Sequence, residues 1–241
     1  MSDARQASGT LATIAAGGIL RVGLFPSFFY GRSADGELTG WGIEMARELA
    51  QRLGVAAVFV ERASPPAVVQ ALRGGDCDVA FLGISAERAA EVDFTPPWVQ
   101  AEFTFLVPTG SLIERIGDAD RAGLRIGVVR NHAMDSALHG KLLQAPRVYA
   151  NTPDAAFAML ERSEVDVLAG IRPGLVGYAA RAPGSRVLAD RYGANVIGLA
   201  VAKGDSAWRD LVSTFVADSK ASGIAQAAAV RVGAAGLEIV G

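Results

Sequence analysis

Short apolar runs alternate with segments of helical periodicity through most of this 241-residue chain. Within residues 42–53, the positions Ile43, Ala46, Ala50 and Leu53 fall on one face of a helix. One apolar run precedes this segment and another follows it. Such β-α-β alternation predicts a parallel sheet whose crossover connections are right-handed.

The alternation starts again after Pro108, Thr109 and Gly110. The chain is therefore expected to hold two α/β units in tandem, as the same architecture used twice and not as a sequence repeat that aligns well. Strands are expected at 20–25, 57–60, 78–83, 124–129, 147–150 and 166–171, and helices at 42–53, 66–75, 134–143, 153–163, 206–222 and 223–232.

Two further extended segments, 101–108 and 194–204, lie between the units and after the second one. If the last helices return to the first unit, these segments are two hinge strands that join the lobes. The expected fold class is α/β, with two lobes that are each a mostly parallel sheet flanked by helices. A ligand would bind at the carboxyl ends of the strands, in the crevice between lobes. The expected bounds are 1–100 plus 204–241 for lobe one and 101–203 for lobe two, with hinge strands near 100–104 and 195–203.

Composition excludes several classes of protein. Hydrophobic residues make up 51% of the chain, which supports a sizeable core, and the net charge of −2 argues against a nucleic-acid partner. No apolar run reaches 18 residues, so membrane insertion is not expected. One cysteine and two histidines give no metal-ligand spacing, and no catalytic or cofactor-binding motif is present, so neither metal nor cofactor is predicted.

The first 18 residues lack a basic start followed by a continuous apolar core, which is the pattern of a signal peptide. Either the chain is cytoplasmic or an export signal has been removed.

The apolar run that ends at Gly83 continues directly into Ser85, Glu87 and Arg88. A helix that begins here offers free backbone N–H groups to an anion, and a guanidinium can grip a carboxylate with two hydrogen bonds. The alternative is structural: Ser85 is only an N-cap, and Arg88 pairs with Glu91.

Two other strand-to-helix junctions carry polar groups. Arg130, Asn131 and His132 follow the strand expected at 124–129, and Arg172 follows Ile171 at the end of another strand. Each arginine either reaches the crevice or is solvated, and Asn131 can serve as an N-cap.

Aromatic residues gather around the first long helix. Phe28, Phe29 and Tyr30 are consecutive, so they cannot all point the same way, and Trp41 opens the helix. At least one is expected to line the crevice and pack a ligand, and the alternative places all of them in the core of the lobe.

Several stretches taken together resemble the family 3 extracellular solute-binding proteins of ABC importers, from about residue 18 to 232. These stretches are GGILRVGLFP, DGELTGWGIEMARELAQRLGV, ALRGGDCDVAFLGIS, AERAAEVDFTPPW and FVADSKASGIAQ. The resemblance implies the type 2 periplasmic-binding-protein fold, a small-molecule ligand and an ABC permease as partner. It also implies a periplasmic location and a monomer.

The resemblance assigns roles to particular residues. Ser85 and Arg88 match the hydroxyl and the arginine that hold a ligand carboxylate, at the strand end marked by Gly83. Residues 130–132 match the helix start in lobe two that contacts the same group.

Two departures from the family bear on the ligand. An aspartate that pairs with a ligand ammonium is replaced by Ile171, and the acidic position at the start of the first long helix is Gly42, although Glu44 remains. A buried ammonium without a carboxylate would be costly. With Arg88, Arg130 and Arg172, the sequence favours a small organic anion over a standard α-amino acid.

Four alternatives are considered. Cyclohexadienyl dehydratases share these motifs, but residues 171–174 lack the acidic run that dehydration needs. A lyase-like enzyme would use His132 and Glu44 as acid and base. A cytoplasmic ligand sensor and an interaction protein that has lost its ligand are the other two.

Overall fold

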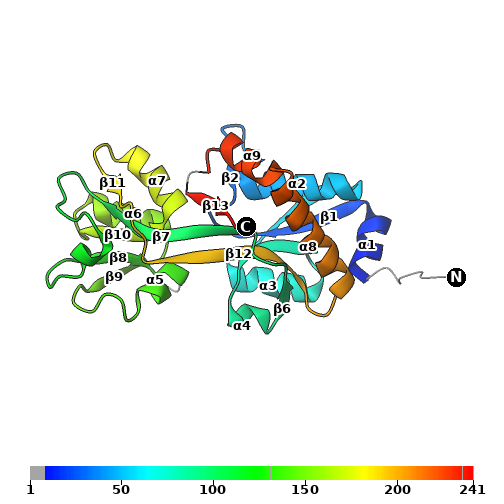
Figure 1. Cartoon of the computed structure of the whole chain (residues 1–241), viewed down its shortest axis with the longest axis horizontal. Coiled ribbons are helices and arrows are strands. Elements are labelled where there is room, and N and C mark those ends of the chain that lie inside the picture. The colour runs from blue at the N-terminus through cyan, green and yellow to red at the C-terminus, as the bar shows by residue number, and fades with distance from the viewer. Residues whose placement is uncertain (1–8, 131, 235, 241) are drawn as a thin grey trace. The chain divides into compact units, whose positions relative to one another are not determined.

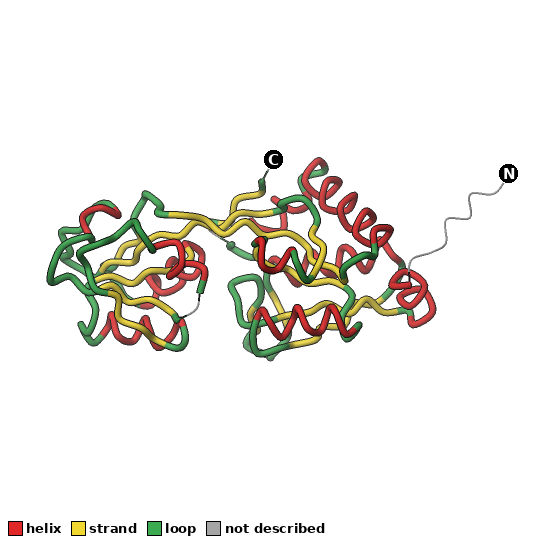
Figure 2. Tube along the Cα trace, turned by 90° about the horizontal axis from the view of Figure 1, so that it is seen from below, coloured by secondary structure: helices red, strands yellow, loops and turns green. Residues whose placement is uncertain are grey.

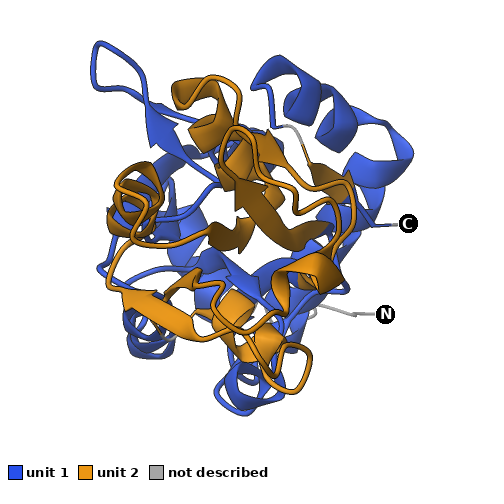
Figure 3. Ribbon diagram, turned by 90° about the vertical axis from the view of Figure 1, so that its left-hand side faces the viewer, with its two compact units in different colours: residues 1–99, 196–234, 239–241 blue, residues 100–195, 235–238 orange. Residues whose placement is uncertain are grey.

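The computed structural model describes residues 9–130, 132–234 and 236–240 (Figure 1). The chain forms two compact units (Figure 3): the first holds residues up to 99, 196–234 and those from 239 onward, and the second holds 100–195 and 235–238. The sequence had placed residues up to 203 in the second lobe. In the structure, residues 196–202 belong to the first unit, because the strand they form pairs with the first unit's sheet.

The first unit is built on a sheet with the strand order β4-β1-β5-β12. β1 is parallel to both β4 and β5, while β12 is antiparallel to β5 and also pairs with β6. The elements are α1 (Gly9–Gly17), β1 (Ile19–Leu24), β2 (Gly31–Arg32), β3 (Leu38–Thr39), α2 (Trp41–Leu53), β4 (Ala56–Glu61), α3 (Pro65–Gly74), β5 (Val79–Gly83), α4 (Ala86–Ala89), β6 (Val92–Phe94), β12 (Gly193–Ala202), α8 (Ser206–Ala221) and α9 (Ile224–Arg231).

Local sequence signals explain where the helices of this unit begin and end. The Ser64 hydroxyl accepts a hydrogen bond from the Ala67 N–H and caps α3, whose first residue is Pro65. Gly54 and Gly75 adopt the left-handed conformation directly after α2 and α3, where a side chain would be strained.

The second unit has the strand order β7-β10-β8-β9. β8 is parallel to β9 and β10, and β7 is antiparallel to β10. The elements are β7 (Val99–Val107), the 3₁₀ helix η1 (Ile116–Ala119), β8 (Ile126–Val129), α5 (Ala133–Leu138), β9 (Arg147–Ala150), α6 (Pro153–Glu161), β10 (Val167–Ile171), α7 (Arg172–Arg181), β11 (Arg186–Val187) and the C-terminal β13 (Leu237–Ile239), of which β11 and β13 pair with β7.

Helices cover both faces of the second unit's sheet (Figure 2). Met134 and Leu138 of α5 belong to one buried cluster, together with Phe105 of β7. Phe157 of α6 and Leu175 of α7 belong to the other. The strands are therefore buried on both sides, which agrees with their almost continuous apolar sequence.

The same arginine-aspartate clamp occurs at the amino ends of the parallel strands in both units. The guanidinium of Arg21 on β1 bonds both carboxylate oxygens of Asp78, at 2.5 and 3.1 Å, and the Arg21 N–H bonds Asp78 as well. Arg125 makes the equivalent bonds with Asp166, at 3.0 and 3.1 Å, again including its backbone N–H. Each clamp joins neighbouring strands.

Most predicted elements are present within a few residues, but the helix expected at 134–143 ends at Leu138. Gly140 follows with a positive φ, and Leu143 is largely exposed, so the apolar period there does not mark a buried helix face. Residues 31–32 and 38–39 pair as the short antiparallel hairpin of β2 and β3. The elements that sequence reasoning missed include α1, β6, η1, β11 and β13.

Candidate functional site

The carboxyl end of β5 leads into the very short helix α4. Ser85 is the N-cap of that helix, and its hydroxyl accepts a hydrogen bond from the Arg88 N–H at 3.3 Å. The Arg88 guanidinium folds back along the strand end, where Nη1 donates to the Gly83 carbonyl at 2.8 Å. Because α4 contains only Ala86–Ala89, the charged group at this strand end is the guanidinium rather than the helix dipole.

Arg88 is half-buried, and no carboxylate pairs with it among the described residues. Burial lowers the pKa of its guanidinium, and the nearby charge of Glu87 opposes this shift. A guanidinium stays protonated at neutral pH, so a positive charge is held here with one carbonyl as its hydrogen-bond acceptor. The Glu91 pairing considered from the sequence does not form, because Glu91 pairs with Arg73.

Two of the four candidate aromatic residues belong to the core. Phe29 is 4% exposed and Trp41 is 1% exposed. Their ring centroids lie 5.9 Å apart, and both lie 5.7 Å from Phe81 of β5. The indole N–H of Trp41 donates to the Ala225 carbonyl at 2.9 Å. Both side chains are used for packing in the first unit, and their role as ligand contacts stays a prediction.

Phe28 and Tyr30 remain half-buried. Phe28 lies against Phe29, with ring centroids 4.3 Å apart. The Tyr30 hydroxyl donates to Glu61 at 3.4 Å, and burial together with the Glu61 charge raises the pKa of Tyr30. These two are the candidate aromatic residues that keep surface available for a ligand.

The start of α2 leaves little room for a larger residue at Gly42. A Cβ atom there would lie 3.1 Å from the Phe29 Cβ and 3.2 Å from the Phe29 carbonyl oxygen, and the Gly42 N–H already donates to that carbonyl. Glu44, two residues further along the helix, forms an ion pair of 2.6 Å with Arg231 of α9. Neither position of the first unit offers a free carboxylate.

In the second unit, Arg130 and His132 follow β8 and lie in different surroundings. The exposed Arg130 guanidinium stacks over the Tyr149 ring of β9, 4.8 Å from its centroid. His132 is half-buried at the N-cap position of α5, where its side chain makes no capping bond, and burial lowers its pKa. A neutral imidazole is therefore favoured at pH 7. The predicted site residue Asn131 lies outside the described residues.

At the end of β10, the guanidinium of Arg172 donates hydrogen bonds to residues of its own unit. Its Nε donates to Glu102 at 2.6 Å, Nη1 to the Leu188 carbonyl at 2.8 Å and Nη2 to the Ala189 carbonyl at 2.9 Å. The side chain is 17% exposed. Its donors stabilise the fold in this structure, and a contact of Arg172 with the ligand stays a prediction. Ile171 packs partly buried against one of the unit's core clusters.

Sequence reasoning missed Glu102, because it lies on the hinge strand β7 and not at a strand-to-helix junction. In the β7–β10 pairing, Ile171 is opposite Phe103, so Glu102 lies beside the position where the resemblance expects an aspartate. Arg172 and Arg191 both pair with its carboxylate.

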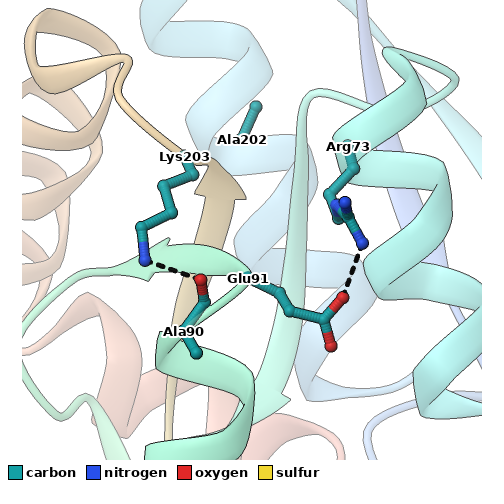
Figure 4. Close-up of a pocket in the computed structure, with 5 residues that line it drawn as sticks. All are labelled: Arg73, Ala90, Glu91, Ala202 and Lys203. Atoms are coloured by element: carbon teal, nitrogen blue, oxygen red, sulfur yellow. Dashed lines mark hydrogen bonds and ion pairs between the residues drawn. The ribbon is translucent and has the colours of Figure 1, made fainter.

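A pocket of about 340 Å³ lies elsewhere in the first unit (Figure 4). Its charged groups already have partners: Arg73 pairs with Glu91 at 2.7 Å, and the Lys203 ammonium donates to the carbonyls of Ala89 and Ala90 at 2.9 and 2.7 Å. This pocket does not include the end of β5. The residues that line it are Arg73, Ala90, Glu91, Ala202 and Lys203.

Within the described part of the chain, no group of three or more histidine, cysteine or acidic side chains is arranged to hold a metal ion. Among the same residues, the helices are too short or too polar to cross a membrane. The lone thiol of Cys77 is buried, and burial raises its pKa to about 12, so it is a core residue rather than a nucleophile.

Comparisons with known proteins agree with the fold and cover most of the chain. The model of the family "Bacterial extracellular solute-binding proteins, family 3" matches residues 20–231. An ABC transporter glutamine-binding protein of Bacillus subtilis is 26% identical over 195 residues, which are 79% of this chain and 71% of that protein. An L-arginine-binding protein of Pseudomonas aeruginosa is 26% identical over 214 residues, which are 82% and 81% of the two chains.

Solved structures give the same result. The crystal structure of an ancestral amino acid-binding protein, described as a precursor of cyclohexadienyl dehydratase, superposes with a TM-score of 0.80 at 25% identity, over 94% of this chain and 99% of that one.

Proposed function

Because the chain belongs to the bacterial extracellular solute-binding proteins of family 3, we propose that it captures a small organic anion for an ABC importer. The ligand in this proposal has a carboxylate and no ammonium group. The description of the family as extracellular supports a location outside the cytoplasm. The importer as partner is supported by the glutamine-binding relative, which is named as an ABC transporter protein.

Arg88 is the observation that carries the proposal. Its guanidinium is half-buried and has the Gly83 carbonyl as its side-chain partner, without a carboxylate among the described residues. An anionic ligand would supply the missing negative charge with charge-assisted hydrogen bonds. Ser85 lies on the same turn and can donate its hydroxyl proton to the ligand while it accepts from the backbone.

Three positions where a carboxylate could pair with a ligand ammonium do not offer a free one, which supports a ligand without an amine. Gly42 has no side chain and little room for one, Glu44 is neutralised by Arg231, and Ile171 is apolar. Glu102 is acidic, but it already pairs with two arginines. An amino-acid ammonium would have to compete with these guanidinium groups, and leaving it unpaired in a buried site is costly.

The relatives named above bind glutamine and arginine by their descriptions, so the experiment must be able to return an amino acid. Native mass spectrometry of the purified chain identifies any ligand that co-purifies. Thermal-shift and calorimetric titrations then compare small carboxylates with the standard amino acids. A ligand present at 100 times its dissociation constant adds about 2.7 kcal/mol of stability, which such a screen detects readily. An amino acid as the tightest ligand would overturn the proposal.

Arg88→Ala tests the assignment within the site. If its guanidinium bonds the ligand carboxylate in a desolvated setting, the variant loses about 2–5 kcal/mol of binding free energy. Arg73→Ala is the matched control, because Arg73 is an exposed, ion-paired arginine of the same unit. Equal affinities of the two variants would remove Arg88 from the site.

A lyase-like reaction is the second candidate, favoured by one observation: His132 is half-buried and its lowered pKa keeps it neutral and able to accept a proton. Glu44, its suggested partner, is held by Arg231 in the other unit's helices. Product formation from a carboxylate ligand by purified protein, lost in His132→Ala, would favour the enzyme, and stoichiometric binding without product would favour the transporter protein.

A further inference from the structure

Two arginines share one carboxylate at the end of β10 in the second unit. Arg172 Nε lies 2.6 Å from Glu102 Oε2, and Arg191 Nη1 lies 3.0 Å from Glu102 Oε1. Two positive charges and one negative charge leave one positive charge in excess. The two guanidinium groups differ in how this excess can be used.

The donors of Arg172 are occupied, and those of Arg191 are largely free. Beyond Glu102, Arg172 bonds the carbonyls of Leu188 and Ala189, and its side chain is 17% exposed. Arg191 is 50% exposed, and Glu102 is its one hydrogen-bond partner among the residues that the structure describes. Its Nε and second Nη therefore remain available to an incoming acceptor.

Strand pairing puts Arg191 at the edge of the sheet where a ligand is expected. Ile171, the last residue of β10, pairs with Phe103 of β7, and the Tyr192 N–H donates to the Phe103 carbonyl at 3.0 Å. Arg191 thus lies level with the carboxyl end of β10, with β7 between them, and β8 runs parallel to β10 and ends at the same edge. Ligands of open α/β sheets bind outside the carboxyl ends of the parallel strands.

We infer that Arg191 contacts the carboxylate of the anionic ligand, in the role that the sequence assigned to Arg172. Glu102 positions Arg191, and Arg172 in turn holds Glu102. The inference rests on the proposed function, since it names a further side chain that binds the proposed ligand. A guanidinium suits this task because it stays charged and presents several donors in one plane.

The test compares Arg191→Ala and Arg191→Lys with the matched control Arg162→Ala. Arg162 is also an exposed arginine of the second unit, paired with the single carboxylate of Glu164, but it lies before the amino end of β10. Calorimetry uses a fixed panel of propionate, succinate and benzoate as probes. For every probe that binds the wild type, Arg191→Ala is expected to bind about 10-fold more weakly or worse, Arg191→Lys in between, and Arg162→Ala like the wild type.

Arg191→Ala is expected to fold, because Glu102 keeps its bond to Arg172. Chemical modification gives a second measurement on the unmutated protein: phenylglyoxal is applied with and without a bound probe, and modified arginines are located by peptide mass spectrometry. Protection of Arg191 by the probe supports the inference. Equal modification in both samples, or an affinity of Arg191→Ala equal to that of Arg162→Ala, overturns it.

Failure of the inference and failure of the proposed function give different results. If a probe binds the wild type, and Arg88→Ala lowers the affinity for it but Arg191→Ala does not, only the inference is wrong. If the standard amino acids bind the wild type and the carboxylate panel does not, the proposed function is wrong and the inference falls with it.

Discussion

The two units are alike at the amino ends of their parallel strands and differ at the carboxyl ends. Arg21 with Asp78 and Arg125 with Asp166 are equivalent clamps that join neighbouring strands. At the opposite ends, Arg88 of the first unit has no carboxylate partner among the described residues, whereas Arg172 of the second unit pairs with Glu102 and bonds backbone carbonyls. Positions that stabilise the sheet are therefore shared, and positions available to a ligand are particular to each unit.

The largest effect on folding is expected from Arg172→Ala. This change removes bonds to Glu102 and to two backbone carbonyls in a mostly buried setting, so it should destabilise the second unit by about 3 kcal/mol. Far-UV circular dichroism during urea unfolding measures the loss. A change below 1 kcal/mol would mean that Arg172 is not the structural residue that these contacts indicate.

Asp78→Ala should have the next largest effect, about 2 kcal/mol, because the Asp78 side chain is 2% exposed and its loss leaves the Arg21 guanidinium partly buried without its partner. The tryptophans of the chain, Trp41, Trp98 and Trp208, all lie in the first unit, so tryptophan fluorescence reports this unit selectively. An unchanged fluorescence midpoint would argue against the clamp as a source of stability.

The second clamp should contribute less, about 1 kcal/mol, because Asp166 and Arg125 are more exposed. The hydrogen bond from Arg125 lowers the pKa of Asp166 in the folded state. Its contribution is therefore present above the unfolded-state value near 4 and is lost as the pH falls through the lower folded-state value. Asp166→Asn should flatten this acid-side loss in urea midpoints recorded from pH 6 to 3. The same pH profile for variant and wild type would contradict the assignment.

Arg88→Ala should change stability by less than about 1 kcal/mol in the absence of ligand, since one hydrogen bond to Gly83 is lost and a desolvated charge is removed. The contrast with Arg172→Ala sharpens the comparison between the two strand ends. A thermal unfolding midpoint far below that of the wild type would show that Arg88 also serves the fold.

The alternation of strand and helix patterns was sufficient to predict the architecture, because the spacing of apolar residues shows which face of each strand or helix is buried. Side-chain partners were harder to predict, since they depend on residues far away in the sequence. In the sequence, Arg172 and Arg88 both follow the end of a strand. In the structure, Arg172 pairs with Glu102, because β7 brings that distant residue beside it. The paired clamps had a signal in the sequence: LRVG and LRIG open the two sheets, and an Asp-Val pair opens a later strand in each.

Aromatic residues illustrate the same limit. Phe28 and Phe29 are adjacent in the sequence and differ in burial, because only the backbone conformation of the loop decides which ring turns toward Trp41 and Phe81. Sequence alone could state that the three consecutive rings diverge, and it could not say which one points inward.

The close contact between Gly42 and Phe29 has a consequence for how this chain could change its specificity. Any residue with a Cβ at position 42 meets the Phe29 backbone carbonyl, which cannot rotate away as a flexible side chain can. A single substitution to aspartate at this point would disturb the loop before it supplied a new charge. An evolutionary or engineered path toward amine-bearing solutes is therefore expected to run through position 171, or to require the loop around residue 29 to be remodelled first.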